Sequence, residues 1–159
     1  MPPPEQDFSV RIRRAAMSEM GEVTQLVRGA GLPLEGLTEA AVVLVAEGHG
    51  ELAGTVALEE HGSGDERAYL LRSAAVAPAW RGRGVGSALT RAALAHVDSR
   101  GASVALLTGT ADGYFAAFGF HRVERDQVPA ALAASPELRG ACPVSARAML
   151  RAPASISAV

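Results

Sequence analysis

Residues 81–86, RGRGVG, place two arginines and three glycines where an apolar, strand-like run ends and a helical pattern begins at Val85. Glycine allows a backbone to approach a ligand closely, and the free N–H groups and dipole of a helix N-terminus favour an anion. The guanidinium groups of Arg81 and Arg83 add fixed positive charge. These residue types at this junction predict a phosphate-binding loop. The alternative is an ordinary glycine-rich connection whose arginines serve solubility.

Two common phosphate loops fail on spacing. A Walker loop needs Gly-Lys-Ser/Thr after its glycines, and no lysine occurs here. A dinucleotide fingerprint needs a third glycine where Ser87 stands. It also needs an acidic residue about twenty positions later, where the chain has Leu106 and Leu107.

A third loop does match. Arg81, Gly84 and Gly86 fit the Arg/Gln-x-x-Gly-x-Gly/Ala motif, so the segment resembles the acetyl-CoA-binding loop of the GNAT superfamily of N-acetyltransferases. One strand later, residues 114–120, YFAAFGF, resemble the family segment that ends the next helix and starts the next strand. The two motifs in this order are more specific than either alone.

Longer stretches carry the resemblance from Ser9 to Leu150, among them LLRSAAVAPAWRGRGVGSAL and ACPVSARAM. They are similar to GNAT proteins of bacterial arsenic-resistance operons and, more distantly, to the glutamate N-acetyltransferase domain of arginine biosynthesis. The resemblance implies acetyl transfer from acetyl-CoA to the amine of a small carboxylated, amino-acid-like substrate, such as a glutamate analogue or an organoarsenical. A lone Cys142 argues against direct binding of trivalent arsenic.

The resemblance also implies a fold: an α/β (α+β) GNAT domain with a mixed, mostly antiparallel sheet of about seven strands, flanking helices and a splayed central strand pair. In that fold, backbone groups beside the splay hold the pantetheine arm, and the Val76 amide is the expected oxyanion donor. The implied acetyl-CoA-binding residues are Ala75, Val76, Arg81, Gly82, Arg83, Gly84, Val85, Gly86, Ser87, Tyr114 and Phe115.

The general acid departs from the family pattern. Many GNAT enzymes have a tyrosine four residues before the glycine of the aromatic motif, where this chain has Phe115. Its neighbour Tyr114 lies about 100° further round a helix. Tyr114 is therefore the candidate catalytic acid, with a packing role, or an unassisted thiolate, as the alternative.

The general base is not evident from the sequence. Glu59 and Glu60 end a strand beside the expected cleft, and Glu35 lies in the loop expected to cover the substrate. Each is otherwise an ordinary solvated carboxylate, and a chain of water molecules is an equal alternative.

Arg72 interrupts an apolar, central strand, on the face shared with Leu70. A buried guanidinium needs a carboxylate partner. The ligand supplies it if Arg72 binds substrate; Glu59 or Asp112 supplies it in an internal ion pair. Thr108 ends the next strand and adds a hydroxyl, so the predicted substrate-binding residues are Arg72, Thr108 and Glu35.

The elements that position these groups alternate between strands and helices. Ser18 is the predicted N-cap of the first helix, which should stop near residues 29–31. A tight turn containing Gly48 and Gly50 predicts a hairpin. Strands are expected at 8–15, 41–48, 51–60, 68–77, from 103, from 120 and at 144–151, and helices from 85 to about 101 and at 110–118, with a proline-punctuated loop at 128–143.

Composition bounds the function. The 159 residues carry a formal net charge of −2 with dispersed arginines, which argues against nucleic acid. One cysteine and four separated histidines predict no metal site. No segment predicts a membrane span or signal region, so a cytoplasmic protein is expected.

We predict one domain at 8–151 between tails at 1–7 and 152–159, and a homodimer stays open. Rival functions are acetylation of a peptide or antibiotic amine, and a silent acetyl-CoA-binding regulator.

Overall fold

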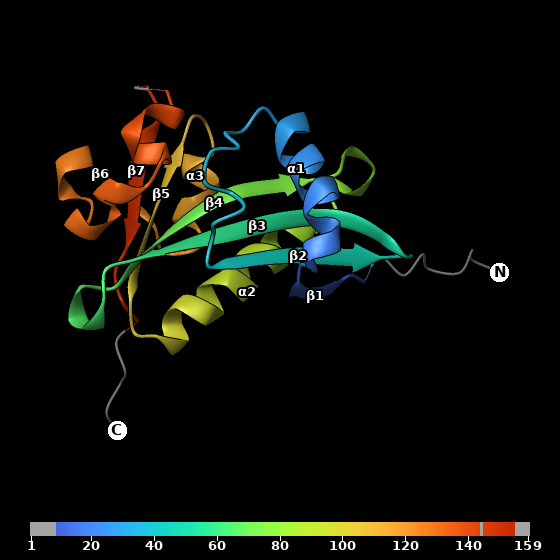
Figure 1. The fold of residues 1–159 in the computed structure, drawn as a ribbon, viewed down its shortest axis with the longest axis horizontal. Coiled ribbons are helices and arrows are strands. Elements are labelled where there is room, and N and C mark those ends of the chain that lie inside the picture. Colours follow the sequence, from blue (N-terminus) through green and yellow to red (C-terminus); the bar gives the residue numbers. More distant parts are fainter. Residues whose placement is uncertain (1–8, 144, 155–159) are drawn as a thin grey trace.

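A seven-stranded mixed sheet forms the centre of the molecule in this computed structural model, which describes residues 9–143 and 145–154 (Figure 1). The strand order is β1-β2-β3-β4-β5-β7-β6, and the pair β4–β5 is parallel. The expected fold class is confirmed. The strands are β1 (Arg11–Arg14), β2 (Val42–Gly48), β3 (Glu51–His61), β4 (Ala68–Val76), β5 (Ser103–Thr108), β6 (His121–Val123) and β7 (Arg147–Arg151).

The predicted hairpin is confirmed as β2 and β3. Its turn holds His49 and Gly50 at φ values of 52° and 76°, the left-handed region that a tight hairpin turn requires. Parts of three other predictions lie outside the described residues: the start of the first strand at Phe8, the start of the last at Val144, and the tails apart from 152–154.

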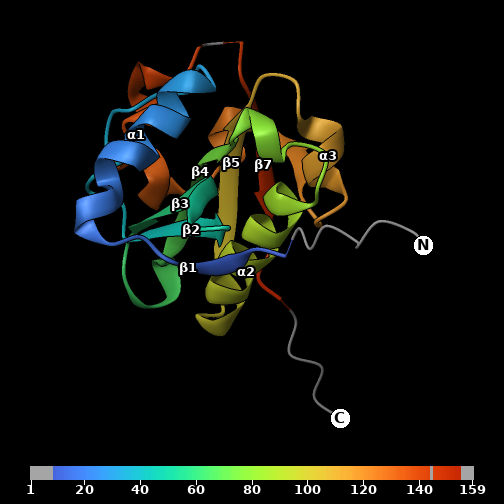
Figure 2. The same cartoon turned by 90° about the vertical axis from the view of Figure 1, so that its right-hand side faces the viewer.

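Helices cover both faces of the sheet (Figures 1 and 2). α2 and α3 pack on one face around the larger core, which includes Tyr69, Leu89 and Phe115. α1 packs on the other face through Val23 and Val27. The helices are α1 (Met20–Gly29), α2 (Val85–Ser99) and α3 (Asp112–Ala116), with shorter turns η1 (Met17–Glu19), η2 (Gly64–Glu66) and η3 (Pro78–Trp80).

The prediction of Ser18 as an N-cap is wrong. α1 begins at Met20, and the preceding 3-10 turn makes Glu19 its N-cap residue. The Glu19 carboxylate accepts the Ala16 N–H at 2.8 Å and pairs with Arg13 at 2.7 Å. The hydrogen bonds from Arg13 and then Ala16 lower the pKa of Glu19 to about 2. The start of α1 therefore carries the Glu19 carboxylate, held by Arg13 and the Ala16 amide. The sequence had suggested the Ser18 hydroxyl for this position.

The proline-punctuated segment between β6 and β7 is more regular than the predicted loop. It packs on the same face as α1, where Leu132 joins Leu70 and Ala105 in a small core. Arg125 fixes its far end by donating to the carbonyls of Pro143 and Ala146, both at 3.0 Å. We call residues 124–146 the β6–β7 segment; its turns are η4 (Arg125–Gln127), η5 (Ala130–Ala134) and η6 (Glu137–Ala141).

The central strands part after a short pairing. β4 and β5 are in register only from Ala68 to Leu70, although both strands continue beyond this point. A register shift in β4 places Ala57 opposite Arg72 but Thr55 opposite Ala75, and Ser73 between them has φ 58°. This bulge bends β4 and frees backbone groups from the ladder. The predicted splayed pair is therefore present, and it opens a wedge in the sheet.

Candidate active site

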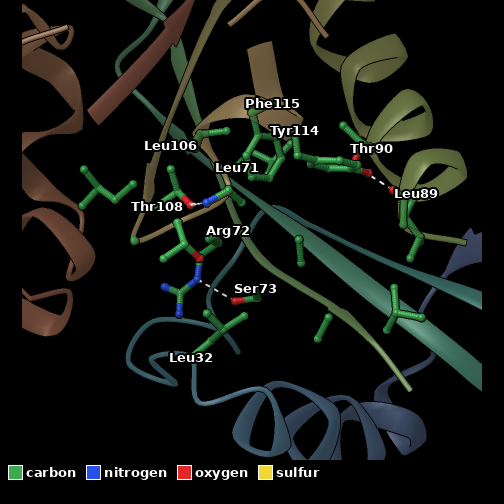
Figure 3. Close-up of a pocket in the computed structure, with 18 of the residues that line it drawn as sticks. Leu32, Leu71, Arg72, Ser73, Leu89, Thr90, Leu106, Thr108, Tyr114 and Phe115 are labelled. Carbon is green, nitrogen blue, oxygen red and sulfur yellow. Dashed lines mark hydrogen bonds between the residues drawn. The ribbon is translucent and has the colours of Figure 1, made fainter. Parts of the chain in front are cut away.

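A cavity of about 750 Å³ occupies the wedge between β4 and β5 (Figure 3). Its loop end is formed by residues 75–76, 81–82 and 84–87, where β4 leads into α2. Its arginine end is formed by Leu32, Pro33, Arg72, Ser73, Glu137 and Cys142. One continuous space therefore joins the glycine-rich loop to the buried arginine. Cavities of this size commonly hold small molecules.

Two glycines of the loop end adopt a backbone conformation that favours glycine. Gly82 and Gly84 have φ values of 75° and 80°, and Gly84 is the N-cap residue of α2. The first N–H groups of α2 have no partner within the helix, so they and the helix dipole make the loop end attractive to an anion. A β-carbon at Gly86 would lie 3.5 Å from both the Val76 side chain and the Tyr114 hydroxyl, so these two groups border the same space.

A buried tryptophan packs beside the loop and lines the cavity. Trp80 is 5% exposed and lies so close to Gly48 that a β-carbon there would come within 2.4 Å of its ring. The Arg83 guanidinium lies 5.7 Å from the Trp80 ring centroid, within cation–π range. All the predicted acetyl-CoA-binding residues line the cavity except Arg83, which does not contribute to its lining.

Tyr114 and Phe115 have different surroundings in the structure. Phe115 is buried in the core, whereas Tyr114 is 42% exposed and its hydroxyl lies 3.4 Å from Ser87 Oγ at the start of α2. Figure 3 shows the Tyr114 ring directed toward α2. Tyr114 therefore supplies the hydroxyl at the loop end, while its neighbour Phe115 packs in the core.

Arg72 is held by the protein. Its side chain has no exposed surface, and its guanidinium pairs with Glu59 at 2.9 Å through Nη1 and with Glu137 at 3.3 Å through Nε. The pair with Glu59 confirms one internal partner considered from the sequence. The alternative prediction, an ion pair between Arg72 and Asp112, is wrong, because the Asp112 carboxylate pairs with Arg147 at 2.9 Å.

Three neutral oxygens complete the surroundings of Arg72. Nη1 donates to the Glu35 carbonyl at 2.5 Å, Nη2 to the Pro33 carbonyl at 3.1 Å, and Nε to Ser73 Oγ at 3.0 Å. One guanidinium thus ties β4 to the loop after α1, and through Glu137 to the β6–β7 segment.

The three carboxylates considered as bases do not line the cavity. Glu59 is 5% exposed and lies between Arg72 and His61, whose Nε2 is 2.8 Å from Glu59 Oε1. Glu60 accepts a hydrogen bond from the Tyr69 hydroxyl, and Glu35 meets Arg72 through its backbone carbonyl. Thr108 does line the cavity, and its Oγ1 accepts the Ala111 N–H at 3.0 Å.

The sequence did not point to Glu137 and Cys142. They are 4% and 8% exposed, line the arginine end, and are joined by a 3.4 Å contact in which the thiol donates to Glu137 Oε1. Burial raises the pKa of Glu137, and burial followed by the charge of Glu137 raises the pKa of Cys142 to about 12, so this thiol is neutral near pH 7. The available signal was a glutamate within the apolar run AALAASPELRGACP.

Residues 39–122 match the family model of the acetyltransferase (GNAT) domain, which is more than half of the chain. The chain belongs to this GNAT acetyltransferase family. The match spans β2 to β6 and so includes the loop end of the cavity and Arg72. The protein is therefore an acetyltransferase that uses acetyl-CoA.

Solved structures agree with this assignment. N-acetylglutamate synthase from Neisseria gonorrhoeae, complexed with coenzyme A and N-acetyl-glutamate, superposes with a TM-score of 0.76 at 21% identity, over 92% of this chain and 35% of that one. Rv2747 from Mycobacterium tuberculosis, in complex with CoA and NLQ, gives 0.72 at 26% identity over 91% and 99%. A GNAT acetyltransferase from Brucella melitensis, in complex with acetyl-CoA, gives 0.59 at 26% identity over 72% and 84%.

This chain spans about a third of the length of the Neisseria enzyme. No curated protein sequence matches it significantly. The resemblance to proteins of arsenic-resistance operons stays a prediction. Within residues 9–143 and 145–154, no helix is long and apolar enough to cross a membrane, and no group of three or more His, Cys, Asp or Glu side chains is arranged to hold a metal ion.

Proposed function

We propose that this acetyltransferase acts on the amine of a small substrate that carries a carboxylate. The observation that carries the proposal is the closed arginine end of the cavity. The loop after α1 packs there on the β6–β7 segment, so that a β-carbon at Gly36 would lie 2.8 Å from the Pro136 side chain and 3.2 Å from Arg72. A peptide substrate needs an open groove for the residues that follow its N-terminus, whereas a small amine fits a closed pocket.

The structural neighbours support the same substrate class. The Neisseria enzyme is named for N-acetylglutamate synthesis and was solved with that product. The carboxylate of such a substrate would accept a hydrogen bond from the hydroxyl of Thr108, which lines the cavity. A glutamate analogue or an organoarsenical with a free amine belongs to this class.

The loop end fits acetyl-CoA. The two glycines at positive φ and the N-terminus of α2 make a cradle for the pyrophosphate, and Arg81 adds charge. The freed backbone of β4 near Ala75 and Val76 would hold the pantetheine arm, and the Val76 amide would donate to the oxyanion that forms on the acetyl carbonyl.

An acceptor screen tests the proposed substrate class. The protein is incubated with acetyl-CoA and a thiol reagent, and free CoA is followed over amino acids, their carboxamides, short peptides and aminoglycosides. We expect kcat/KM at least about tenfold higher for an acid than for its amide, because the amide lacks the charge-assisted contact. Equal values for acids and amides, or turnover only of peptides or aminoglycosides, would contradict the proposal. Tight binding of acetyl-CoA without any turnover would indicate a regulatory module.

Tyr114 is the proposed acid for the leaving CoA thiolate. Tyr114→Phe should lower kcat by about tenfold or more while the Kd for acetyl-CoA stays within about twofold. Ser87→Ala, which removes only the neighbour of the phenol, should lower kcat far less. An unchanged rate in Tyr114→Phe across the pH range would leave Tyr114 with a packing role.

A further inference from the structure

We infer that Glu137 is the general base of this enzyme, receiving a proton from the acceptor's ammonium group at the arginine end of the cavity. The inference deepens the proposed function, on which it rests, by naming the group that prepares the amine. Among the carboxylates that pair with Arg72, only that of Glu137 belongs to a residue lining the cavity.

The backbone around Glu137 is fixed before any substrate arrives. Ser135 is fully buried, and its Oγ accepts the Glu137 N–H at 3.2 Å. The Glu137 carbonyl accepts the Cys142 N–H at 3.3 Å, which closes the turn η6 on itself. The side chain is then oriented by Arg72 at one oxygen and by the Cys142 thiol at the other. A catalytic group held by such contacts needs no rearrangement when the substrate binds.

The charges around Glu137 favour a cationic partner. Arg72 on β4 is the nearest cation, and it is shared with Glu59 on β3. Glu35, in the loop after α1, adds further negative potential, and Cys142 in the same segment is a neutral thiol. Two buried carboxylates thus share one guanidinium, and an incoming ammonium group would supply the missing positive charge.

The same surroundings make Glu137 a better proton acceptor than an ordinary glutamate. Burial is the main cause that raises its pKa, while Arg72 opposes the shift and Glu59 and Glu35 add to it. A base whose pKa lies nearer to that of the ammonium group transfers a proton at less cost. Glu59 does not line the cavity. Its carboxylate is held by Arg72 at one oxygen and by His61 at the other.

The acceptor's R–NH₃⁺ gives one proton to the Glu137 carboxylate, and the nitrogen lone pair forms the C–N bond at the acetyl carbonyl carbon. When the tetrahedral intermediate collapses, the C–S bond breaks. The second proton, carried by the nitrogen, ends on the CoA sulfur. Glu137 then releases its proton to solvent through the cavity, and the products are the N-acetylated acceptor, CoA–SH and one H⁺.

The test compares Glu137→Gln with Glu59→Gln. Each variant removes one carboxylate partner of Arg72, but only the first changes the cavity wall. We expect Glu137→Gln to lower kcat/KM at pH 7 by about 100-fold or more, and Glu59→Gln to lower it by less than about tenfold. The Kd for acetyl-CoA, measured by calorimetry, should stay within about twofold for both. Because Arg72 keeps its pair with Glu59 and its three neutral acceptors in Glu137→Gln, this variant should keep the melting temperature of the wild type.

The pH profile distinguishes a base from a structural residue. With Glu137 ionised and the acceptor protonated, kcat/KM of the wild type should be flat between the pKa of Glu137 and that of the acceptor amine. In Glu137→Gln only the free amine can react, so log kcat/KM should rise with a slope of one over this range and approach the wild-type value at high pH. Glu137→Asp should keep the flat profile at a lower rate.

Two results would overturn the assignment: equal losses for Glu137→Gln and Glu59→Gln, or a flat profile in Glu137→Gln. Both are measured with the best acceptor of the screen and with its carboxamide. The preference for acid over amide tests the proposed substrate class, and the loss on changing Glu137 tests the base. Failure of either leaves the result of the other intact.

Discussion

Replacing Arg72 with methionine should lower the free energy of unfolding by about 3–5 kcal/mol, because the change leaves two buried carboxylates without their shared cation. Glu59 and Glu137 are each no more than 5% exposed, so water cannot take over the role of the guanidinium. The loss is measured by urea unfolding of the protein without ligands at pH 7. It should be smaller at low pH, because burial raises the pKa of Glu137 and this carboxylate loses its charge as the pH falls.

An exposed pair of similar length provides the control for Arg72. Arg147 and Asp112 lie 2.9 Å apart, but their side chains are 45% and 27% exposed. Arg147→Met should therefore cost less than about 1 kcal/mol. Adding Glu59→Gln and Glu137→Gln to Arg72→Met should recover part of the stability, because it removes the stranded charges. Equal losses in the two single arginine variants would show that burial does not govern the Arg72 network.

Local signals account for what the sequence predicted well. The β2–β3 hairpin depends on residues within its own turn, and the loop end of the cavity depends on Gly82 and Gly84, whose positive φ values are a property of each position. The run of apolar residues in β4 likewise needs no knowledge of its partners. Such features can be predicted because the residues that define them are neighbours in the chain.

The arginine end was predicted only in part, because its contacts join distant segments. The sequence identified Arg72 as a residue that needs a partner, and it suggested Glu59 from the adjacent strand. It gave no reason to bring Glu137 to the same place, since that contact depends on how the β6–β7 segment folds back over β4.

The second large effect is expected at Gly84. Gly84→Val should weaken acetyl-CoA binding by about 30-fold or more, which corresponds to about 2 kcal/mol. Valine disfavours the φ of 80° that Gly84 adopts at the start of α2, so the loop must leave the conformation that directs the first helical N–H groups into the cavity. Isothermal titration calorimetry with acetyl-CoA measures the change, and circular dichroism verifies that the variant is folded.

Gly101→Val separates this effect from the general cost of the substitution. Gly101 has φ 62° just beyond the other end of α2, and, as at Gly84, a β-carbon there would meet no atom within 4 Å. The two variants should therefore lose similar stability, about 1–2 kcal/mol each. Only Gly84→Val should change the Kd, because Gly101 lies roughly 16 Å along α2 from Thr90, the last residue of this helix that lines the cavity. If both variants bound acetyl-CoA as the wild type does, the N-terminus of α2 would not be the pyrophosphate site, and the anion would have to bind to arginine side chains alone.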